Sequence, residues 1–202
     1  MCAAASLFAA GRVECSGKDV LDIGACIGDT AIYFVLSGAK HVYAVEPYPA
    51  TFKAMLRNID ANGLGSRITP LNLGIGNADT KIMLTDKGSD RPGNQSLHDM
   101  RQGKQVPVFT LSSIMRRLKL DDCVLKMDCE GMEYDIILSS SDSTLRAFSQ
   151  IILEYHFGHE NLARRLEKAG FRVKLLDAPH SPALIDDSNS QYISGTLYAY
   201  RA

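Results

Sequence analysis

Acidic side chains and a histidine close two apolar runs in the second half of the chain. Asp128 and Glu130 close the first run, and Glu154 and His156 close the next. Because side chains alternate along a strand, the members of each pair are expected to share a face. An imidazole that titrates near neutral pH can take the proton of an attacking hydroxyl, so His156 is the candidate general base. We predict that these four residues form a catalytic centre where two neighbouring strands end.

The same residues allow other interpretations. An Asp, Glu and His cluster could bind Mg²⁺ or another divalent ion that lowers the pKa of an acceptor, so a metal is compatible with the sequence but is not part of the predicted site. Asp128 and Glu130 could instead cap the helix that we expect to begin at Gly131. Lys126, expected on the same face, could neutralise the acids.

A glycine turn and a later acid together indicate a nucleoside site. Gly24 lets the backbone pass close to a ligand, and Gly28 opens a helix whose N-terminus favours an anionic group. Cys26 stands where a dinucleotide fingerprint needs glycine, which argues against a pyrophosphate ligand. About 20 residues further on, Glu46 ends the next strand, where a carboxylate can accept both hydroxyls of a ribose. The alternatives are a plain strand-to-helix turn and a solvated acid.

Three blocks, in this order, resemble the FkbM family of S-adenosylmethionine-dependent methyltransferases. The opening motif D-x-G-A-x-x-G-D matches residues 22–29, a short strand-to-helix lead-in matches residues 108–114, and the motif K-x-D-x-E-G-x-E matches residues 126–133. The resemblance covers residues 20–156. It implies a Rossmann-like methyltransferase that uses S-adenosylmethionine and no pyrophosphate ligand, in agreement with the missing glycine.

The resemblance also implies roles for individual residues. Methyl transfer would go to an acceptor oxygen, most readily a hydroxyl of a sugar, glycan or secondary metabolite. Gly24, Ala25 and Gly28 would line the methionine part of the cofactor, Glu46 the ribose, and residues 73–74 the adenine edge. The predicted cofactor-binding set is Asp22, Gly24, Ala25, Cys26, Gly28, Asp29, Thr30, Glu46, Pro47, Leu73, Gly74 and Asp128. The predicted catalytic set, facing the reacting centre, is His156, Asp128, Glu130 and Glu154.

Two rival functions keep the nucleoside site. The acceptor could be RNA, with the basic residues near 116–119 and 164–165 touching phosphates. Alternatively, the chain could be a nucleoside-binding module without catalysis. We predict a small-molecule or glycan acceptor and no nucleic-acid partner, and a homodimer is compatible with the sequence.

The elements that must position these residues alternate between strand and helix. Apolar strands are expected at 20–23, 41–46, 68–75, 123–128 and 150–155, an added pair at 81–84 and 106–109, and an antiparallel final pair at 171–176 and 196–201. Helices are expected at 1–10, 29–36, 49–62, 110–118, 131–139 and 161–169. This order predicts an α/β protein with a mainly parallel sheet wrapped on both faces, and ligands beyond the carboxyl ends of the strands. The resemblance specifies a three-layer, doubly wound Rossmann-like methyltransferase fold with seven strands and an antiparallel C-terminal strand.

The composition fits one globular domain over residues 1–202, with its core from residue 19. The 22 Lys and Arg residues nearly balance the 23 Asp and Glu residues, so the net charge of −1 supplies no bulk attraction to polyanions. Five cysteines without a C-x-x-C pair argue against a disulfide framework and favour a cytoplasmic location. No run approaches the ~20 apolar residues of a membrane span. Residues 86–104 are expected to form a mobile loop, and whether it is a substrate lid stays open.

Overall fold

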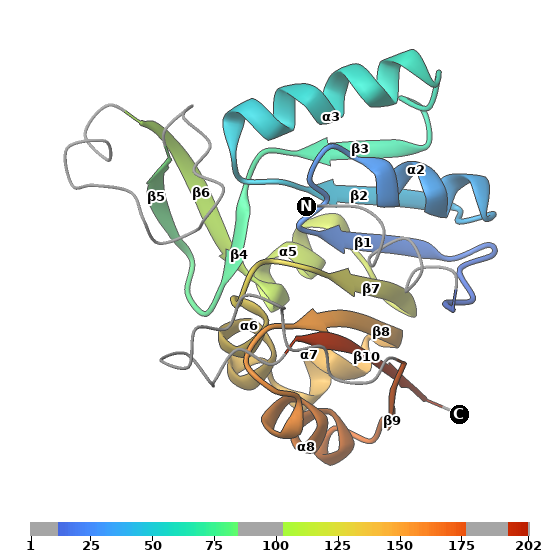
Figure 1. Ribbon diagram of the computed structural model, residues 1–202, viewed down its shortest axis with the longest axis vertical. Helices are drawn as coiled ribbons and strands as arrows, with labels where there is room; N and C mark the ends of the chain where they lie inside the picture. The colour runs from blue at the N-terminus through green and yellow to red at the C-terminus, as the bar shows by residue number, and fades with distance from the viewer. Residues whose placement is uncertain (1–11, 85–102, 177–193, 202) are drawn as a thin grey trace.

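The computed structural model (Figure 1) describes residues 12–84, 103–176 and 194–201. The expected helix at 1–10 lies outside these residues. The expected mobile loop at 86–104 also lies outside them, except for its last two residues, which lead into a strand. Within the described ranges, the helices are too short or too polar to cross a membrane.

Seven strands form the main sheet, in the order β3-β2-β1-β7-β8-β10-β9. Neighbours from β3 to β8 are parallel, and β10 runs antiparallel between β8 and β9. The chain moves outward in one direction from β1 and in the other from β7, so the predicted doubly wound sheet with an antiparallel C-terminal strand is confirmed. The strands are β1 (Asp19–Ile23), β2 (His41–Val45), β3 (Ile68–Leu71), β7 (Cys123–Met127), β8 (Phe148–Tyr155), β9 (Arg172–Leu175) and β10 (Gly195–Tyr200).

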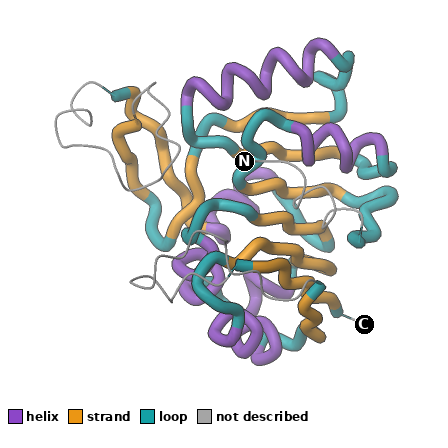
Figure 2. The backbone as a smooth tube through the Cα atoms, in the orientation of Figure 1, coloured by secondary structure: helices purple, strands orange, loops and turns teal. Residues whose placement is uncertain are grey.

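A second, three-stranded sheet stands beyond the edge where the parallel strands end (Figures 1 and 2). It consists of β4 (Gly74–Gly76), β6 (Lys104–Thr110) and β5 (Thr80–Leu84), in that order. The antiparallel pairing of β5 with β6 confirms the expected added pair.

The single strand expected at 68–75 is wrong. β3 ends at Leu71, and β4 leaves the main sheet to pair in parallel with β6. The physical reason lies at Asn72, whose side-chain amide donates to the carbonyls of Glu46 and Pro47 at 3.0 Å each. These hydrogen bonds anchor the chain to the end of β2 at the point where it turns toward the second sheet.

Helices pack on both faces of the main sheet. On one face, α2 (Asp29–Leu36) and α3 (Pro49–Ala61) share an apolar core with Val20 of β1. On the other face, residues of the remaining helices share a larger core with Leu21. Because neighbouring residues of β1 point to opposite cores, the strand is buried on both sides and the domain has three layers. The remaining helices are α5 (Leu111–Leu118), α6 (Glu133–Ser139), α7 (Asp142–Arg146) and α8 (Glu160–Lys168), of which α7 was not expected.

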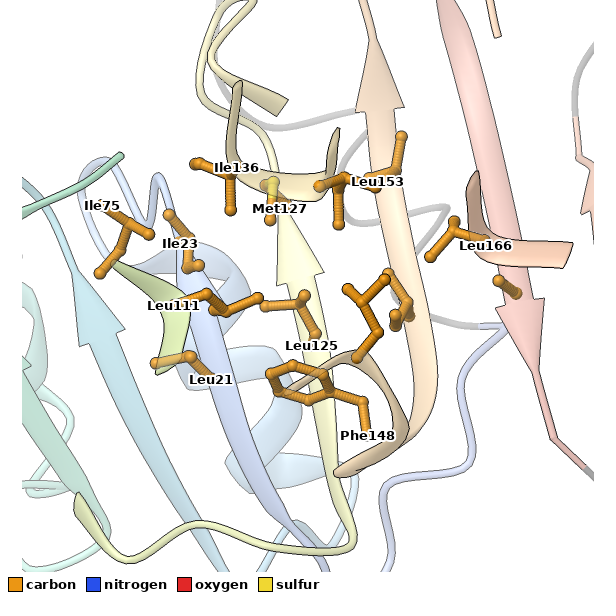
Figure 3. Close-up of a cluster of buried hydrophobic side chains, with 14 of the residues drawn as sticks. Leu21, Ile23, Ile75, Leu111, Leu125, Met127, Ile136, Phe148, Leu153 and Leu166 are labelled. Carbon is orange, nitrogen blue, oxygen red and sulfur yellow. The ribbon is translucent and has the colours of Figure 1, made fainter. Parts of the chain in front are cut away.

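The larger core runs along the central strands up to their carboxyl ends (Figure 3). Met127 and Leu153 come from β7 and β8, and Ile136 from α6 packs with them. These side chains are at most 1% exposed, so each fully buried one contributes about 1.5–3 kcal/mol of burial free energy. Close packing of this kind fixes where the strands end, and therefore where the side chains that follow them lie.

Candidate active site

Four strands end side by side at one edge of the main sheet. Ile23 of β1 pairs with Val45 of β2 on one side and with Met127 of β7 on the other, and Met127 pairs with Leu153 of β8. The residues that follow these positions therefore line the same edge. They include the glycine turn, Glu46, Asp128 and Glu154, as predicted for ligand-binding residues of such a sheet.

The glycine turn passes directly against the exit of β7. Gly24 has a φ of 75°, and a Cβ atom at this position would lie 1.8 Å from the backbone oxygen of Asp128. Contact with the chain itself thus requires glycine at position 24, in addition to the expected approach of a ligand. Gly28 has a φ of 88°, and a Cβ there would lie 2.9 Å from Met55 Cγ. A side chain at either position would strain the turn, and at Gly24 it would overlap backbone atoms.

Glu46 ties the end of β2 to the glycine turn. Its side chain is 5% exposed, and its two carboxylate oxygens accept hydrogen bonds from the backbone N–H of Cys26 at 3.1 Å and of Tyr48 at 2.8 Å. Burial raises the pKa of Glu46 to about 7, although these two hydrogen bonds act in the opposite direction. A carboxylate has about four lone-pair sites, so each oxygen can accept a further hydrogen bond from a hydroxyl.

A buried polar cluster supports the turn from below. Lys126 lies 3.0 Å from Asp22, and its ammonium also donates to the carbonyl of Gly24 at 3.0 Å. The hydroxyl of Thr30 donates to Asp22 at 2.6 Å. Burial opposes the charged ammonium, but the carboxylates of Asp22 and Asp128 outweigh it and hold the pKa of Lys126 above its usual value. Asp22 and Thr30 therefore lie beneath the turn, where they hold the loop that is expected to contact the cofactor.

The acidic block after β7 is arranged differently from the expectation. β7 ends at Met127, so strand alternation stops before Asp128, and Glu130 adopts a left-handed backbone with φ of 55°. The helix expected from Gly131 begins at Glu133, and its N-cap position, Met132, makes no side-chain cap. The alternative role of Asp128 and Glu130 as helix caps is therefore wrong.

Glu133 takes the place of a cap and was missed as a site residue. Its fully buried carboxylate accepts hydrogen bonds from the backbone N–H of Cys129 at 2.6 Å and of Gly131 at 2.8 Å. The signal in the sequence was the last acid of the K-x-D-x-E-G-x-E block. We infer that Glu133 holds the turn between β7 and α6 in shape, because it satisfies two backbone donors that the turn leaves outside any strand or helix.

The predicted meeting of the two strand ends is confirmed for three residues. Asp128, Glu130 and His156 each offer a polar atom, and these atoms all lie within 4.8 Å of one another. His156 is 5% exposed, and its ring lies between two carboxylates, with Nε2 3.6 Å from Glu130 Oε2 and Nδ1 3.5 Å from Glu133 Oε2. We call Asp128, Glu130, Glu154 and His156 the acidic centre.

The protonation states within the acidic centre differ from the expectation. Burial disfavours the charged imidazole, but Glu133 and the neighbouring carboxylates outweigh it and raise the pKa of His156 to about 9. The ring is therefore protonated at neutral pH rather than poised as a free base. Burial, with the charge of Asp128 added, raises the pKa of Glu154 to about 7.

The predicted residues at the end of β3 lie in two places. Leu73 is buried in the larger core, and Gly74 begins β4, where a Cβ would lie 3.9 Å from Pro47. Asn72 is the polar residue at this strand end, and it also accepts a hydrogen bond from Lys104 at 3.0 Å. Asn72 was not among the expected site residues, because the apolar residues around it predict one unbroken strand over 68–75.

Three exposed apolar side chains, which we call the apolar rim, follow strands that end at the site edge. Ile27, Met132 and Phe157 follow β1, β7 and β8, and their side chains are 40%, 42% and 55% exposed. The ring of Phe157 packs so closely on Gly131 that a Cβ there would lie 2.8 Å from it. Exposed apolar groups of this size can contact a ligand that has an apolar face.

Comparison with known proteins gives one family match and several structural ones. A family model described as the methyltransferase FkbM domain matches residues 22–173. The crystal structure of methyltransferase FkbM from Methylobacillus flagellatus superposes with a TM-score of 0.58 at 18% identity, over 94% of this chain and 45% of that chain. The structure of M. capricolum TrmK in complex with S-adenosylhomocysteine superposes with a TM-score of 0.59 at 13% identity, over 100% of this chain and 70% of that one.

One curated sequence shares a shorter segment. The tRNA wybutosine-synthesizing protein 2 homolog of Danio rerio is 42% identical over 57 residues, which is 28% of this chain and 14% of that protein. The chain therefore spans less than half of both the FkbM structure and the zebrafish protein.

Proposed function

Because the chain belongs to the methyltransferase FkbM domain family, we propose that it transfers a methyl group from S-adenosylmethionine to an acceptor hydroxyl. The observation that carries the proposal is the buried Glu46 carboxylate, which is hydrogen-bonded to the glycine turn at Cys26. A buried carboxylate at the end of the second parallel strand is suited to two neighbouring ribose hydroxyls, and the turn beside it lacks the glycine that a pyrophosphate needs.

The residues around Glu46 fit such a cofactor. Each Glu46 oxygen already accepts one backbone N–H, so the carboxylate is oriented before a ligand arrives and needs no rearrangement. Asn72 fixes the backbone just after Glu46, and Lys126 fixes the carbonyl of Gly24 on the other side. S-Adenosylmethionine supplies an already activated methyl group, so the protein contributes mainly positioning and charge.

The acceptor is expected to lie over the acidic centre. Glu154 follows Leu153, the register partner of Met127, and this places it beside Asp128 at the strand ends. Its carboxylate is suited to receive the acceptor's proton, and the protonated His156 can donate a hydrogen bond to the acceptor oxygen. The rim of Ile27, Met132 and Phe157 would contact the apolar face of a sugar ring or secondary metabolite.

Isothermal titration with S-adenosylhomocysteine tests the cofactor assignment. We expect binding well below about 1 mM, a large loss of affinity in Glu46→Ala, and none in Asp60→Ala, which removes an exposed acid on α3. Incubation of the protein with the methyl donor and pooled hydroxyl-bearing metabolites and glycans, read by mass spectrometry, tests the acceptor class. Absence of binding, or equal affinity in both variants, would contradict the proposal.

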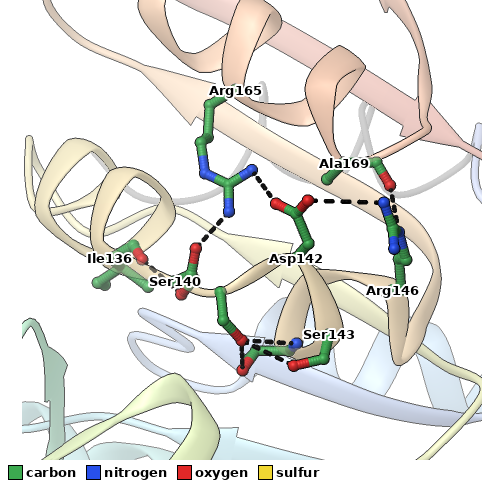
Figure 4. A network of polar contacts seen from close by, with 9 residues as sticks. Ile136, Ser140, Asp142, Ser143, Arg146, Arg165 and Ala169 are labelled. Carbon is green, nitrogen blue, oxygen red and sulfur yellow. Dashed lines mark hydrogen bonds and ion pairs between the residues drawn. The ribbon is translucent and has the colours of Figure 1, made fainter.

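RNA is the second candidate acceptor, and the short match to the zebrafish protein favours it. The basic residues give it less support. Arg165 pairs with Asp142 at 2.8 Å and also donates to the carbonyl of Ser140, so it belongs to the network that joins α7 to α8 (Figure 4). Arg117 lies over the ring of Phe109 at 4.4 Å. A salt-sensitive gel shift with bulk tRNA would favour RNA, and cofactor binding without any methylated product would favour a non-catalytic module.

A further inference from the structure

We propose that Asp128, Glu130 and His156 bind a divalent metal ion at the carboxyl ends of β7 and β8. The binding itself follows from the arrangement of these side chains. Its use in catalysis rests on the methyl transfer proposed above: with the ion bound, His156 Nε2 would carry no proton, and the ion would hold the acceptor oxygen in place of the His156 N–H.

The spacing of the three side chains fits one ion. Metal–ligand bonds to imidazole nitrogen and carboxylate oxygen are about 2.1 Å long, which places neighbouring ligand atoms about 3 to 4 Å apart. His156 Nε2 and Glu130 Oε2 are 3.6 Å apart, and the polar atoms of all three residues lie within 4.8 Å of one another. Glu130 is half exposed, so its side chain can close the remaining distance.

Glu133 supplies an independent indication. A histidine that binds a metal through one ring nitrogen usually donates its other N–H to a carboxylate, which fixes the ring. The fully buried Glu133 lies 3.5 Å from His156 Nδ1 and is itself held by the backbone N–H groups of Cys129 and Gly131. Nε2, on the opposite side of the ring, lies 3.6 Å from Glu130 Oε2.

The charge of the site favours a cation. Asp128, Glu130, Glu133 and Glu154 bring four carboxyl groups to one strand-end cluster. The nearby Lys126 ammonium is already paired with Asp22 at 3.0 Å and donates to the carbonyl of Gly24. A divalent ion would offset the excess negative charge where it is greatest.

The ligand types indicate which ion. One imidazole nitrogen and two carboxylate oxygens suit Mn²⁺ better than Mg²⁺, which prefers oxygen ligands alone. Three protein ligands leave coordination positions for water or for an acceptor hydroxyl. An ion in this position would lower the pKa of that hydroxyl.

Titration of the full chain with MnCl₂, after removal of metals with a chelator, tests the proposal by electron paramagnetic resonance and calorimetry. We expect one ion per chain, and at least about tenfold weaker binding in Glu130→Gln and in His156→Gln. Asp135→Asn, which removes an exposed carboxylate in the first turn of α6, is the matched control and should bind Mn²⁺ as the unmodified chain does. Thermal melts should show that Glu130→Gln stays folded, because Glu130 is half exposed.

The outcomes separate this proposal from the proposed function. Lack of saturable Mn²⁺ binding, or equal weakening in Glu130→Gln and Asp135→Asn, would overturn the metal site. S-Adenosylhomocysteine is titrated in parallel. Mn²⁺ binding with no binding of this thioether would refute the methyltransferase assignment and leave the metal site standing, whereas the reverse result would refute the metal site alone.

Discussion

Replacement of Glu46 by glutamine is expected to make the unfolding free energy of the ligand-free protein less sensitive to rising pH. Burial raises the pKa of Glu46 to about 7 in the folded chain, from 4.5 when exposed. A carboxyl group whose folded pKa is raised stabilises the protein at low pH, where it is protonated in both states. That contribution is lost as pH rises from about 4.5 through about 7. The unmodified protein should therefore lose stability over this window, and Glu46→Gln should not show the Glu46 part of that loss.

The magnitude follows from the two pKa values. A difference of about 2.5 in pKa corresponds to about 3.4 kcal/mol, of which about 2 kcal/mol falls between about pH 5 and pH 7.5. Glutamine has one acceptor oxygen, so either the Cys26 or the Tyr48 N–H loses its partner, at a cost of about 1–3 kcal/mol. That cost is the same at both pH values. The way in which the difference in unfolding free energy between Glu46→Gln and the unmodified chain changes with pH therefore reports the ionisation of Glu46 alone.

Urea unfolding of both proteins at the two pH values measures the effect. The unfolding free energy of Glu46→Gln, relative to the unmodified chain, should rise by about 2 kcal/mol from about pH 5 to pH 7.5. Asp60→Asn, an exposed acid on α3, should show no such change. A change in this relative unfolding free energy below about 0.5 kcal/mol, or one of opposite sign, would refute the inference that burial raises the pKa of Glu46.

Three further predictions concern the turn, its support and the rim. Gly24→Ala should lower the unfolding free energy by about 2–4 kcal/mol in urea, because its Cβ would overlap the Asp128 carbonyl; a loss below about 1 kcal/mol would contradict the close approach. Lys126→Met should cost about 3–5 kcal/mol, because Asp22 is left buried and uncompensated, and an unchanged melting temperature would argue against the ion pair. Phe157→Ala should raise the KM for the acceptor and leave the affinity for S-adenosylhomocysteine unchanged, whereas an equal loss of both would place Phe157 outside the acceptor site.

The sequence was sufficient to predict the main sheet, apart from the end of β3, and to predict the sheet edge that carries the site. Apolar runs closed by acids or glycine marked the ends of β1, β2, β7 and β8, and parallel strands bring such ends together. The break between β3 and β4 could not be read from the sequence, because it depends on hydrogen bonds from Asn72 to carbonyls 25 and 26 residues away. Local apolar pattern carries no information about such contacts.

The electrostatics of the site were also beyond the sequence. The expectation that His156 titrates near neutral pH placed it near Asp128, Glu130 and Glu154 but left out the effect of carboxylate charges on its pKa. Its raised pKa arises from carboxylates on another segment, including Glu133 at 3.5 Å, which spacing within β8 does not reveal. The helix expected at 131–139 has Glu133 inside it, whereas the structure has Glu133 as the first residue of α6, where it holds the preceding turn.

A crystal structure of the protein with S-adenosylhomocysteine tests the central claim most directly. We expect the two ribose hydroxyls on the Glu46 carboxylate, the amino-acid part beside residues 24–28 and the thioether sulfur facing the acidic centre. A ligand bound elsewhere, or a ribose that makes no contact with Glu46, would contradict it.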